Sequence, residues 1–318
     1  MQAEDEIVRV GASLMATRFE VALWGNDESY LRSAGMEALR EIERIEQHLS
    51  IYRTDSDLYE VNAVGAYHPV CVTPFVYQLL ERAKRYWYLT DGAFDPAVGP
   101  LLKVWGFLDD SRKVPSMEEI KAALALCGMG MVELAEENHT VQLLHEGVVL
   151  DPGALGKGYA IDYAVEILKD NKIPGALIHG GTSSVYALGT MPDGSPWKVA
   201  LQNPIVEGST IGYVEISDQS LSVSAPHGKV FTQDGRYFGH VLDPKTGWPA
   251  DRALLAAVTG PSAEEGDAFS TALLVRGQEM LKTVTSSGDS GGLVLERSGD
   301  DALLYSENFG LILADVPE

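Results

Sequence analysis

Two oxygen-bearing side chains, Asp267 and Thr271, stand four residues apart in the chain. The capping-box pattern Ser262-x-x-Glu265 predicts a helix that begins just before them and continues to roughly Val275. Positions four apart share one face of a helix, so this carboxylate and this hydroxyl can supply two hard oxygen ligands to Mg²⁺. The spacing alone favours another role, in which Asp267 stabilises the helix N-terminus and Thr271 donates to a backbone carbonyl.

A histidine and a second carboxylate come together in the segment Gly239–Pro249. The stretch from Asp243 to Gly247 has the composition of a tight turn, which predicts that His240 and Asp243 lie close together at a strand end. A histidine beside a carboxylate can accept a proton near neutral pH. The residue types support equally well a histidine hydrogen-bonded to turn backbone and an aspartate that forms an Asx turn.

A glycine-rich loop, Asp151–Gly158, precedes a predicted helix over Tyr159–Lys169. Glycines let backbone groups approach a ligand closely, and a loop that leads into a helix N-terminus suits phosphate. The loop has neither the Walker pattern nor the Rossmann fingerprint, so it supports neither of those nucleotide-binding folds. An ordinary strand-to-helix turn explains the same residues.

The segment Asp91–Leu101 holds two glycines and two prolines, which predict a rigid loop with close backbone approach. Phe94 in this loop is either a platform for a planar ring or a plug in the hydrophobic core. The composition of the segment favours the core plug.

The 318 residues carry a net charge of −22, from 24 basic and 46 acidic side chains. Such a chain repels a phosphate backbone, which argues against nucleic-acid binding. A phosphate-bearing small ligand would need a bound cation to offset the same repulsion. The only cysteines, Cys71 and Cys127, predict two free and mostly buried thiols rather than a zinc site or a disulfide framework.

No run of eighteen or more apolar residues is present, so the sequence predicts no membrane span. The acidic N-terminus, Met1–Glu6, does not have the composition of a signal peptide. The sequence as it stands therefore predicts a cytoplasmic protein. A periplasmic or membrane-associated location is expected instead if a leader has been removed.

Strand and helix patterns are mixed without a regular alternation, which predicts an α+β fold with mixed or antiparallel sheets. No segment has linker composition, so a single domain over residues 1–318 is expected, with about residues 8–313 as the ordered core. Helices are expected over Tyr30–Leu49, from Thr73-Pro74 to about Tyr88, and from the capping box Ser116-x-x-Glu119 to Gly128. Strands are expected over Val8–Trp24, within Met131–Leu150, over Ala176–His179, Val185–Leu188, Trp197–Leu201, Ile211–Ile216, Ser220–Ser224, Lys229–Thr232, Tyr237–Leu242, and within Leu293–Asp315.

Several of these segments, taken in order, resemble the ApbE-type FAD:protein FMN transferases. Gly92–Pro96 through Leu101, followed by Trp105-Gly106-Phe107, is the most specific block. The others are Met15-Ala16-Thr17, Leu49–Arg53 with Ser56, Asp57 and Asn62, Asp151–Tyr159 with Asp162, Gly180-Gly181, the turn His240–Gly247, and Asp267-Ala268 through Thr271.

The resemblance implies a single α+β unit that uses FAD as substrate and Mg²⁺ as cofactor. The flavin and ribityl end of FAD would be held by Met15, Tyr52, Ala93, Phe94 and Asp95. Adenosine-side and phosphate contacts would come from Lys157, Tyr159 and Asp162. Mg²⁺ would be bound by Asp267, Thr271 and the backbone carbonyl of Gly156, and the acid–base pair would be His240 and Asp243.

The reaction that the resemblance implies transfers FMN from FAD to a threonine or serine hydroxyl of an acceptor protein and releases AMP. Water in place of that hydroxyl would make the enzyme a Mg²⁺-dependent FAD pyrophosphatase, which is one alternative. A flavin-binding protein without turnover is another, although the presence of both Asp267 and Thr271 argues against it.

The chain departs from the family pattern at four places. Gly156 stands where alanine is usual, and Ala16 where glycine is usual. Thr182-Ser183-Ser184 follows the paired glycines where an acidic residue is common, and Val223-Ser224-Ala225 replaces a common Thr-Ser-Gly stretch. A carbonyl ligand tolerates glycine or alanine, so these changes bear on acceptor choice and flavin affinity rather than on the reaction class.

Overall fold

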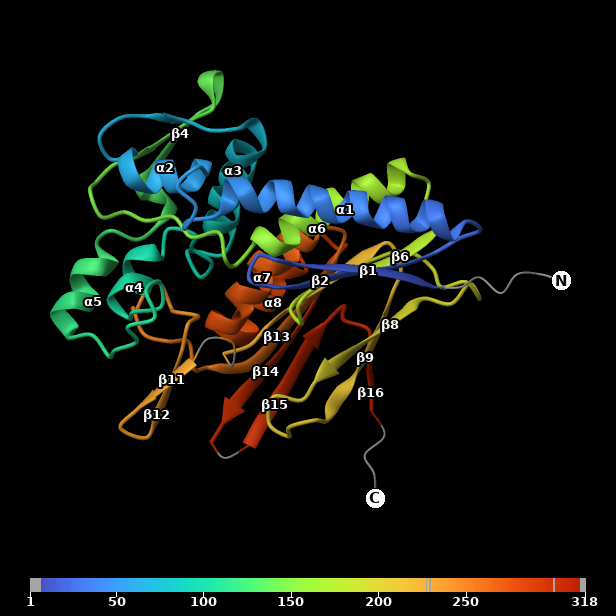
Figure 1. Ribbon diagram of the computed structural model, residues 1–318. Coiled ribbons are helices and arrows are strands. Elements are labelled where there is room, and N and C mark those ends of the chain that lie inside the picture. Colours follow the sequence, from blue (N-terminus) through green and yellow to red (C-terminus); the bar gives the residue numbers. More distant parts are fainter. Residues whose placement is uncertain (1–6, 227, 229, 300, 315–318) are drawn as a thin grey trace.

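The fold is organised around an eight-stranded antiparallel sheet, in a computed structural model that describes residues 7–226, 228, 230–299 and 301–314 (Figure 1). Its strand order is β1-β2-β6-β7-β10-β13-β14-β15. The strands are β1 (Val8–Leu14), β2 (Thr17–Trp24), β6 (Gly175–Gly180), β7 (Ser184–Gly189), β10 (Gln219–Ser224), β13 (Ala253–Gly260), β14 (Gly291–Ser298) and β15 (Asp301–Glu307).

Three helices, α1 (Glu28–Leu49), α6 (Gly156–Asp170) and α7 (Ala263–Arg276), cover one face of this sheet. In α1 the buried residues recur at helical spacing, and the N-cap Asp27 accepts a hydrogen bond from the amide of Tyr30. Figure 1 shows α1 and α6 side by side, and α6 packs in turn against α7. The largest hydrophobic core therefore lies between the helices and the sheet.

A second, three-stranded sheet packs on the other face, in the order β16-β9-β8 (Figure 1). Its strands are β8 (Trp197–Gln202), β9 (Thr210–Ile216) and β16 (Leu311–Leu313). Along β14, Leu293 and Leu295 point into this second core, whereas Val294 between them points into the first. This alternation follows from the period of two in a strand.

The remaining elements gather at one end, away from β8, β9 and β16 (Figure 1). They are α2 (Asp57–Val64), α3 (Pro74–Leu89), α4 (Gly99–Val104), α5 (Met117–Leu124), a small sheet of β3 (Val70–Cys71), β5 (Thr140–Leu143) and β4 (Val132–Ala135), and the hairpin β11 (Val230–Gln233) and β12 (Arg236–Gly239). α8 (Leu281–Val284) is a single short helix after α7. A third core, which contains Trp105 and Phe238, joins α4 and α5 to the hairpin.

The α+β fold class is confirmed, and most of the expected elements are present. β13 was not expected, because its eight residues are all buried and show no polar alternation to mark a strand. α2 and α4 were not expected either, and α4 begins inside the segment predicted to be a loop. α5 ends at Leu124, before the predicted stop at Gly128. Lys229, Asp315 and Met1–Glu6 lie outside the described residues.

Both cysteines are free thiols as expected, but Cys71 is exposed rather than buried. Cys71 lies on β3, a strand of two residues at the edge of the small sheet, where alternate side chains face solvent. No helix within the described part of the chain is long and apolar enough to span a membrane.

Candidate functional site

One large cavity, about 1700 Å³ in volume, lies beside the glycine-rich segment at the start of α6. Most of the site residues predicted from the sequence line it: Met15, Tyr52, Ala93, Asp95, Gly156, Lys157, His240, Asp267 and Thr271. Residues of the main sheet and of β8 also line it, and they include Leu177, Val185, Leu255 and Lys198–Gln202. Segments far apart in the sequence therefore meet at a single cavity.

The tip of the first hairpin forms part of the cavity wall. Met15 and Ala16 both have positive φ, 48° and 57°, in the tight connection between β1 and β2. Non-glycine residues rarely adopt this conformation, and such residues tend to cluster at functional sites. The side chain of Glu46 on α1 accepts a hydrogen bond of 2.7 Å from the amide of Met15, which fixes the turn against the helix.

Asp267 lies on α7 with its carboxylate buried at the cavity wall. Its Oδ2 accepts a hydrogen bond of 2.8 Å from the amide of Gly158, and its Oδ1 accepts one of 2.7 Å from the hydroxyl of Ser184. Burial raises the pKa of Asp267 above its usual value, while the charge of Lys157 acts in the opposite direction. A cation beside this carboxylate would favour its charged form.

Thr271 lies one turn further along α7 and also lines the cavity. Its hydroxyl donates a 3.0 Å hydrogen bond to the carbonyl of Asp267, as expected for a threonine that bonds back to its own helix. The hydroxyl of Ser224 lies 3.5 Å from it and 2.9 Å from the hydroxyl of Ser270. A hydroxyl that donates one bond keeps two acceptor lone pairs, so this structural role is compatible with metal binding.

The donor set of Asp267, Thr271 and the carbonyl of Gly156 fits Mg²⁺, which prefers oxygen ligands. All three residues line the same cavity, and the carboxylate among them is buried. Within the described part of the chain, no group of three or more His, Cys, Asp or Glu side chains can hold a metal ion. A site here would therefore have one carboxylate, supplemented by neutral oxygens, water and substrate phosphate.

Asp95 contributes a second buried carboxylate to the cavity. Its Oδ1 accepts a 2.9 Å hydrogen bond from the amide of Ala97, whereas its Oδ2 has no hydrogen-bond partner among the described residues. Burial raises the pKa of Asp95 to about 6. A buried polar atom without a partner is uncommon, and this one is a candidate to bind a polar group of a ligand.

Phe94, next to Asp95, does not line the cavity. Its ring is fully buried and meets the ring of Tyr86 edge-on at 6.3 Å, so it is the core plug that the composition favoured. Tyr52 is the aromatic side chain that remains available at the cavity, since 62% of it is exposed. A planar ligand that stacked on Tyr52 would cover this exposed face.

His240 follows β12 and lines the cavity, whereas Asp243 does not line it. The carboxylate of Asp243 accepts hydrogen bonds from the amide of Lys245 at 2.8 Å and the hydroxyl of Thr246 at 3.1 Å, as in an Asx turn. The turn is held by the indole N–H of Trp105, which donates a 2.8 Å bond to the carbonyl of Gly247.

Gly247 has a φ of +74°, and a Cβ there would lie 2.5 Å from a side-chain carbon of Ile120. Only glycine fits this position without strain or rearrangement. The turn that carries His240 is thereby packed against the third hydrophobic core.

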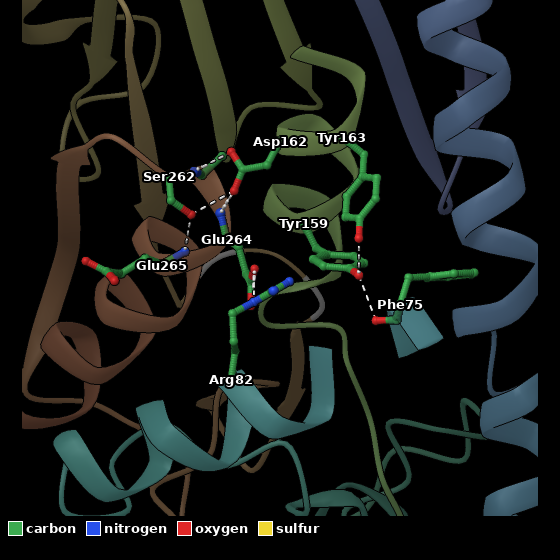
Figure 2. Close-up of polar contacts among 9 residues, drawn as sticks. Phe75, Arg82, Tyr159, Asp162, Tyr163, Ser262, Glu264 and Glu265 are labelled. Atoms are coloured by element: carbon green, nitrogen blue, oxygen red, sulfur yellow. Dashed lines mark hydrogen bonds and ion pairs between the residues drawn. The ribbon is translucent and has the colours of Figure 1, made fainter. Parts of the chain in front are cut away.

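Tyr159 and Asp162 also lie away from the cavity. The hydroxyl of Tyr159 donates a 2.7 Å hydrogen bond to the carbonyl of Phe75, inside the main core (Figure 2). Asp162 lines a separate, smaller cavity of about 440 Å³, together with Arg82 and Glu264. A ligand confined to the large cavity would contact neither Tyr159 nor Asp162.

Asp162 caps the N-terminus of α7. Its Oδ1 accepts a 2.8 Å hydrogen bond from the amide of Ala263, and its Oδ2 accepts bonds from the amide of Glu264 and the hydroxyl of Ser262 (Figure 2). Ser262 in turn accepts from the amide of Glu265, as the capping-box pattern predicts. Burial raises the pKa of Asp162 to about 6. The role of Asp162 is to fix the start of the helix that carries Asp267.

Ser184, Glu46 and Ser224 take part in the site but were not identified as site residues from the sequence. Ser184 and Asp267 are 83 positions apart, and Met15 and Glu46 are 31 apart. No local pattern links residues so distant. The one available signal was that Ser184 and Ser224 fall in segments that depart from the family pattern.

Comparisons with known proteins identify the family of this chain. A family model described as "ApbE family" matches residues 15–292. The FAD:protein FMN transferase of Klebsiella pneumoniae (strain 342) is 30% identical over 315 residues, which cover 98% of this chain and 93% of that protein. The protein of the same name from Treponema pallidum (strain Nichols) is 32% identical over 277 residues, with 82% and 74% covered.

Solved structures resemble nearly the whole chain. The ApbE protein of Thermotoga maritima MSB8 has a TM-score of 0.86 at 26% identity, with 95% of this chain and 97% of that chain covered. The flavin transferase ApbE of Vibrio cholerae has a TM-score of 0.85 at 25% identity, with 96% and 98% covered. The protein whose cavity joins Asp267, Thr271 and His240 belongs to the ApbE family.

Proposed function

We propose that this protein is a Mg²⁺-dependent FAD:protein FMN transferase. It moves FMN from FAD to a threonine or serine hydroxyl of an acceptor protein and releases AMP. The observation that carries the proposal is the buried carboxylate of Asp267 beside the hydroxyl of Thr271 at the wall of one large cavity. The relatives named FAD:protein FMN transferase, matched over nearly the whole chain, support the same activity.

Asp267, Thr271 and the Gly156 carbonyl are the residues that would hold Mg²⁺. Bound there, the ion would neutralise charge on the pyrophosphate of FAD and stabilise the departing phosphate. Neutralisation of the pyrophosphate charge is especially important here, because the chain carries a net charge of −22 and Asp95 adds a further carboxyl group to the cavity.

Other side chains in the cavity are proposed to orient FAD. Lys157, in the first turn of the fifteen-residue helix α6, brings a positive charge to the side where the phosphates would lie. Met15, Tyr52, Ala93 and Asp95 would hold the flavin and ribityl end, with the Asp95 carboxylate accepting a hydrogen bond from a hydroxyl.

His240 is proposed as the proton acceptor. The acceptor hydroxyl attacks the phosphorus on the riboflavin side, its proton passes to the imidazole, and the phosphorus–oxygen bond to AMP breaks. Asp243 is the less suitable base, because its carboxylate oxygens bind within the turn and the residue does not line the cavity. Its role is to hold the turn that places His240.

Two alternatives use the same cavity. A Mg²⁺-dependent FAD pyrophosphatase would transfer FMN to water, and a non-catalytic protein would only bind FAD. Neither alternative needs a site for an acceptor protein beside FAD.

The proposal is tested by incubating the purified protein with FAD, Mg²⁺ and candidate partner proteins, followed by mass spectrometry for an added FMN. Transfer is expected to a threonine or serine, with AMP released in equal amount. AMP release at a rate that no partner changes would select the pyrophosphatase. Tight FAD binding with no AMP after prolonged incubation would select the binding protein.

A further inference from the structure

β8 is an edge strand whose free edge borders the large cavity. In the described part of the chain it pairs with β9 and with no other strand. Lys198, Val199, Ala200, Leu201 and Gln202 all line the cavity, although consecutive side chains of a strand point to opposite faces. Residues from both faces are expected to line a cavity when the strand presents its edge, with its backbone N–H and C=O groups, to that cavity.

The loop after β8 has a defined conformation that hydrogen bonds hold in place. The side chain of Asn203 accepts hydrogen bonds from the amides of Ile205 at 2.9 Å and Val206 at 3.2 Å, and the Asn203 amide donates to the carbonyl of Ser209. This arrangement holds two aliphatic side chains in solvent, with Ile205 61% and Val206 54% exposed. Ile205 also lines the cavity. Two adjacent exposed apolar side chains, one of which lines the cavity, offer apolar contact to a second molecule.

The cavity is larger than a usual small-molecule pocket. About 1700 Å³ exceeds the roughly 300–1,000 Å³ that is usual for a pocket holding one small molecule. The residues proposed to hold Mg²⁺ come from α6 and α7, those proposed to hold FAD come from α6, the first hairpin and the loops after α1 and α3, and none of them comes from β8.

We infer that the edge of β8 is the binding site for the acceptor protein, which adds an extended segment to the sheet as a further strand. Backbone hydrogen bonds to Lys198–Gln202 would bind the segment, and an apolar side chain of the segment would contact Ile205 and Val206. The segment's threonine or serine hydroxyl would then enter the cavity that holds the pyrophosphate. This inference rests on the proposed transferase function.

The test uses a library of short synthetic peptides, each with a single threonine or serine, incubated with the protein, FAD and Mg²⁺. Labelled peptides are identified by mass spectrometry for added FMN. The variant protein carries Ile205→Asp together with Val206→Asp. The matched control carries Ile312→Asp together with Leu313→Asp, which places the same two charges on exposed residues of β16, at the other edge of the same small sheet.

The double variant is expected to raise the KM for labelled peptides about tenfold or more, because it removes the two apolar side chains that the peptide would bury. The Kd for FAD and the KM of the control that carries the Ile312 and Leu313 changes should equal those of the wild type. Labelled peptides resynthesised with N-methylated backbone amides provide the second readout. Methylation should reduce labelling at every second amide along the peptide and have little effect at the amides between them. The reason is that only every second amide of an edge-bound strand faces its partner.

The possible failures are distinguishable. If the wild type releases AMP but labels no peptide, the transferase function itself is wrong. If the wild type labels peptides, and neither the double variant nor N-methylation changes KM, the function stands and docking at β8 is overturned.

Discussion

The backbone amide of Gly158 on α6 donates a 2.8 Å hydrogen bond to Oδ2 of Asp267 on α7, 109 positions further along the chain. The bond requires close contact between the two helices. A Cβ at Gly158 would lie 2.1 Å from the carbonyl oxygen of Ala263. Glycine therefore both permits the helix contact and exposes the amide that orients the carboxylate proposed to bind the metal.

Gly158→Ala is expected to destabilise the protein by about 1–3 kcal/mol, because the added methyl group forces α6 and α7 apart. The matched control is Gly156→Ala, two residues earlier on α6. A Cβ there would meet its nearest atoms at 3.8 and 3.9 Å, so the change should be neutral or stabilising by about 0.5–1 kcal/mol. Urea denaturation of both variants measures the difference, and equal free energies of unfolding would contradict it.

Asp267→Asn is expected to lower Mg²⁺-dependent AMP release on the order of 100-fold or more while the protein stays folded. The asparagine oxygen can accept from the Gly158 amide, and its NH₂ group can donate to the Ser184 hydroxyl, so these two contacts are kept. Activity is measured over a Mg²⁺ titration and stability by urea denaturation. Normal turnover and an unchanged Mg²⁺ requirement would remove Asp267 from the metal site.

Asp95 is expected to make stability depend on pH. Because burial raises its pKa in the folded state from 3.8 to about 6, the folded protein holds this proton more tightly than the unfolded chain. The free energy of unfolding should fall as pH rises from about 4 to about 6, by up to about 3 kcal/mol from this group. Asp95→Asn should lack this contribution.

The measurement is urea denaturation of the wild type and Asp95→Asn at intervals between pH 4 and pH 7. The free energy of unfolding of Asp95→Asn, relative to that of the wild type, should increase as pH rises through this range and level off above about pH 6. A difference that stays constant across the range would show that Asp95 does not titrate there.

His240→Ala is expected to slow FMN transfer about 10²–10⁴-fold with little change in the Kd for FAD, as for loss of a general base. Asp243→Asn should have a much smaller effect, because an asparagine oxygen can still accept from the amide of Lys245 and preserve the turn. Single-turnover transfer and FAD binding are measured for both variants. A collapse of FAD affinity in His240→Ala would make His240 a binding or folding residue.

Asp162→Ala is expected to cost about 1–2 kcal/mol, because the amides of Ala263 and Glu264 lose their cap at the start of α7. The Kd for Mg²⁺ should also rise, because α7 carries Asp267. Asp170→Ala on the same helix α6 is the control, and at an exposed site it should change stability by no more than about 0.5 kcal/mol. If the two variants are equally stable, Asp162 does not hold α7.

Local sequence patterns were sufficient for elements with a clear period or a capping signal. The buried face of α1 and the capping box at Ser116 are both present as expected, because each is determined within a few residues of chain. β13 was missed because a strand buried on both faces has no polar alternation. Its identity depends on pairing with β10 and β14, which are remote from it in the sequence.

The sequence by itself determined the α+β class, the family resemblance and the short-range units Asp267–Thr271 and His240–Gly247, since each lies within one helix or one turn. The family resemblance placed Phe94, Tyr159 and Asp162 in the ligand site, whereas the composition of its segment favoured a core position for Phe94. Only the tertiary structure decided that Phe94 and Tyr159 are core side chains and that Asp162 caps α7. Burial and hydrogen-bond partners depend on which distant segments pack together. No local sequence pattern predicts that α6 contacts α7 at Gly158.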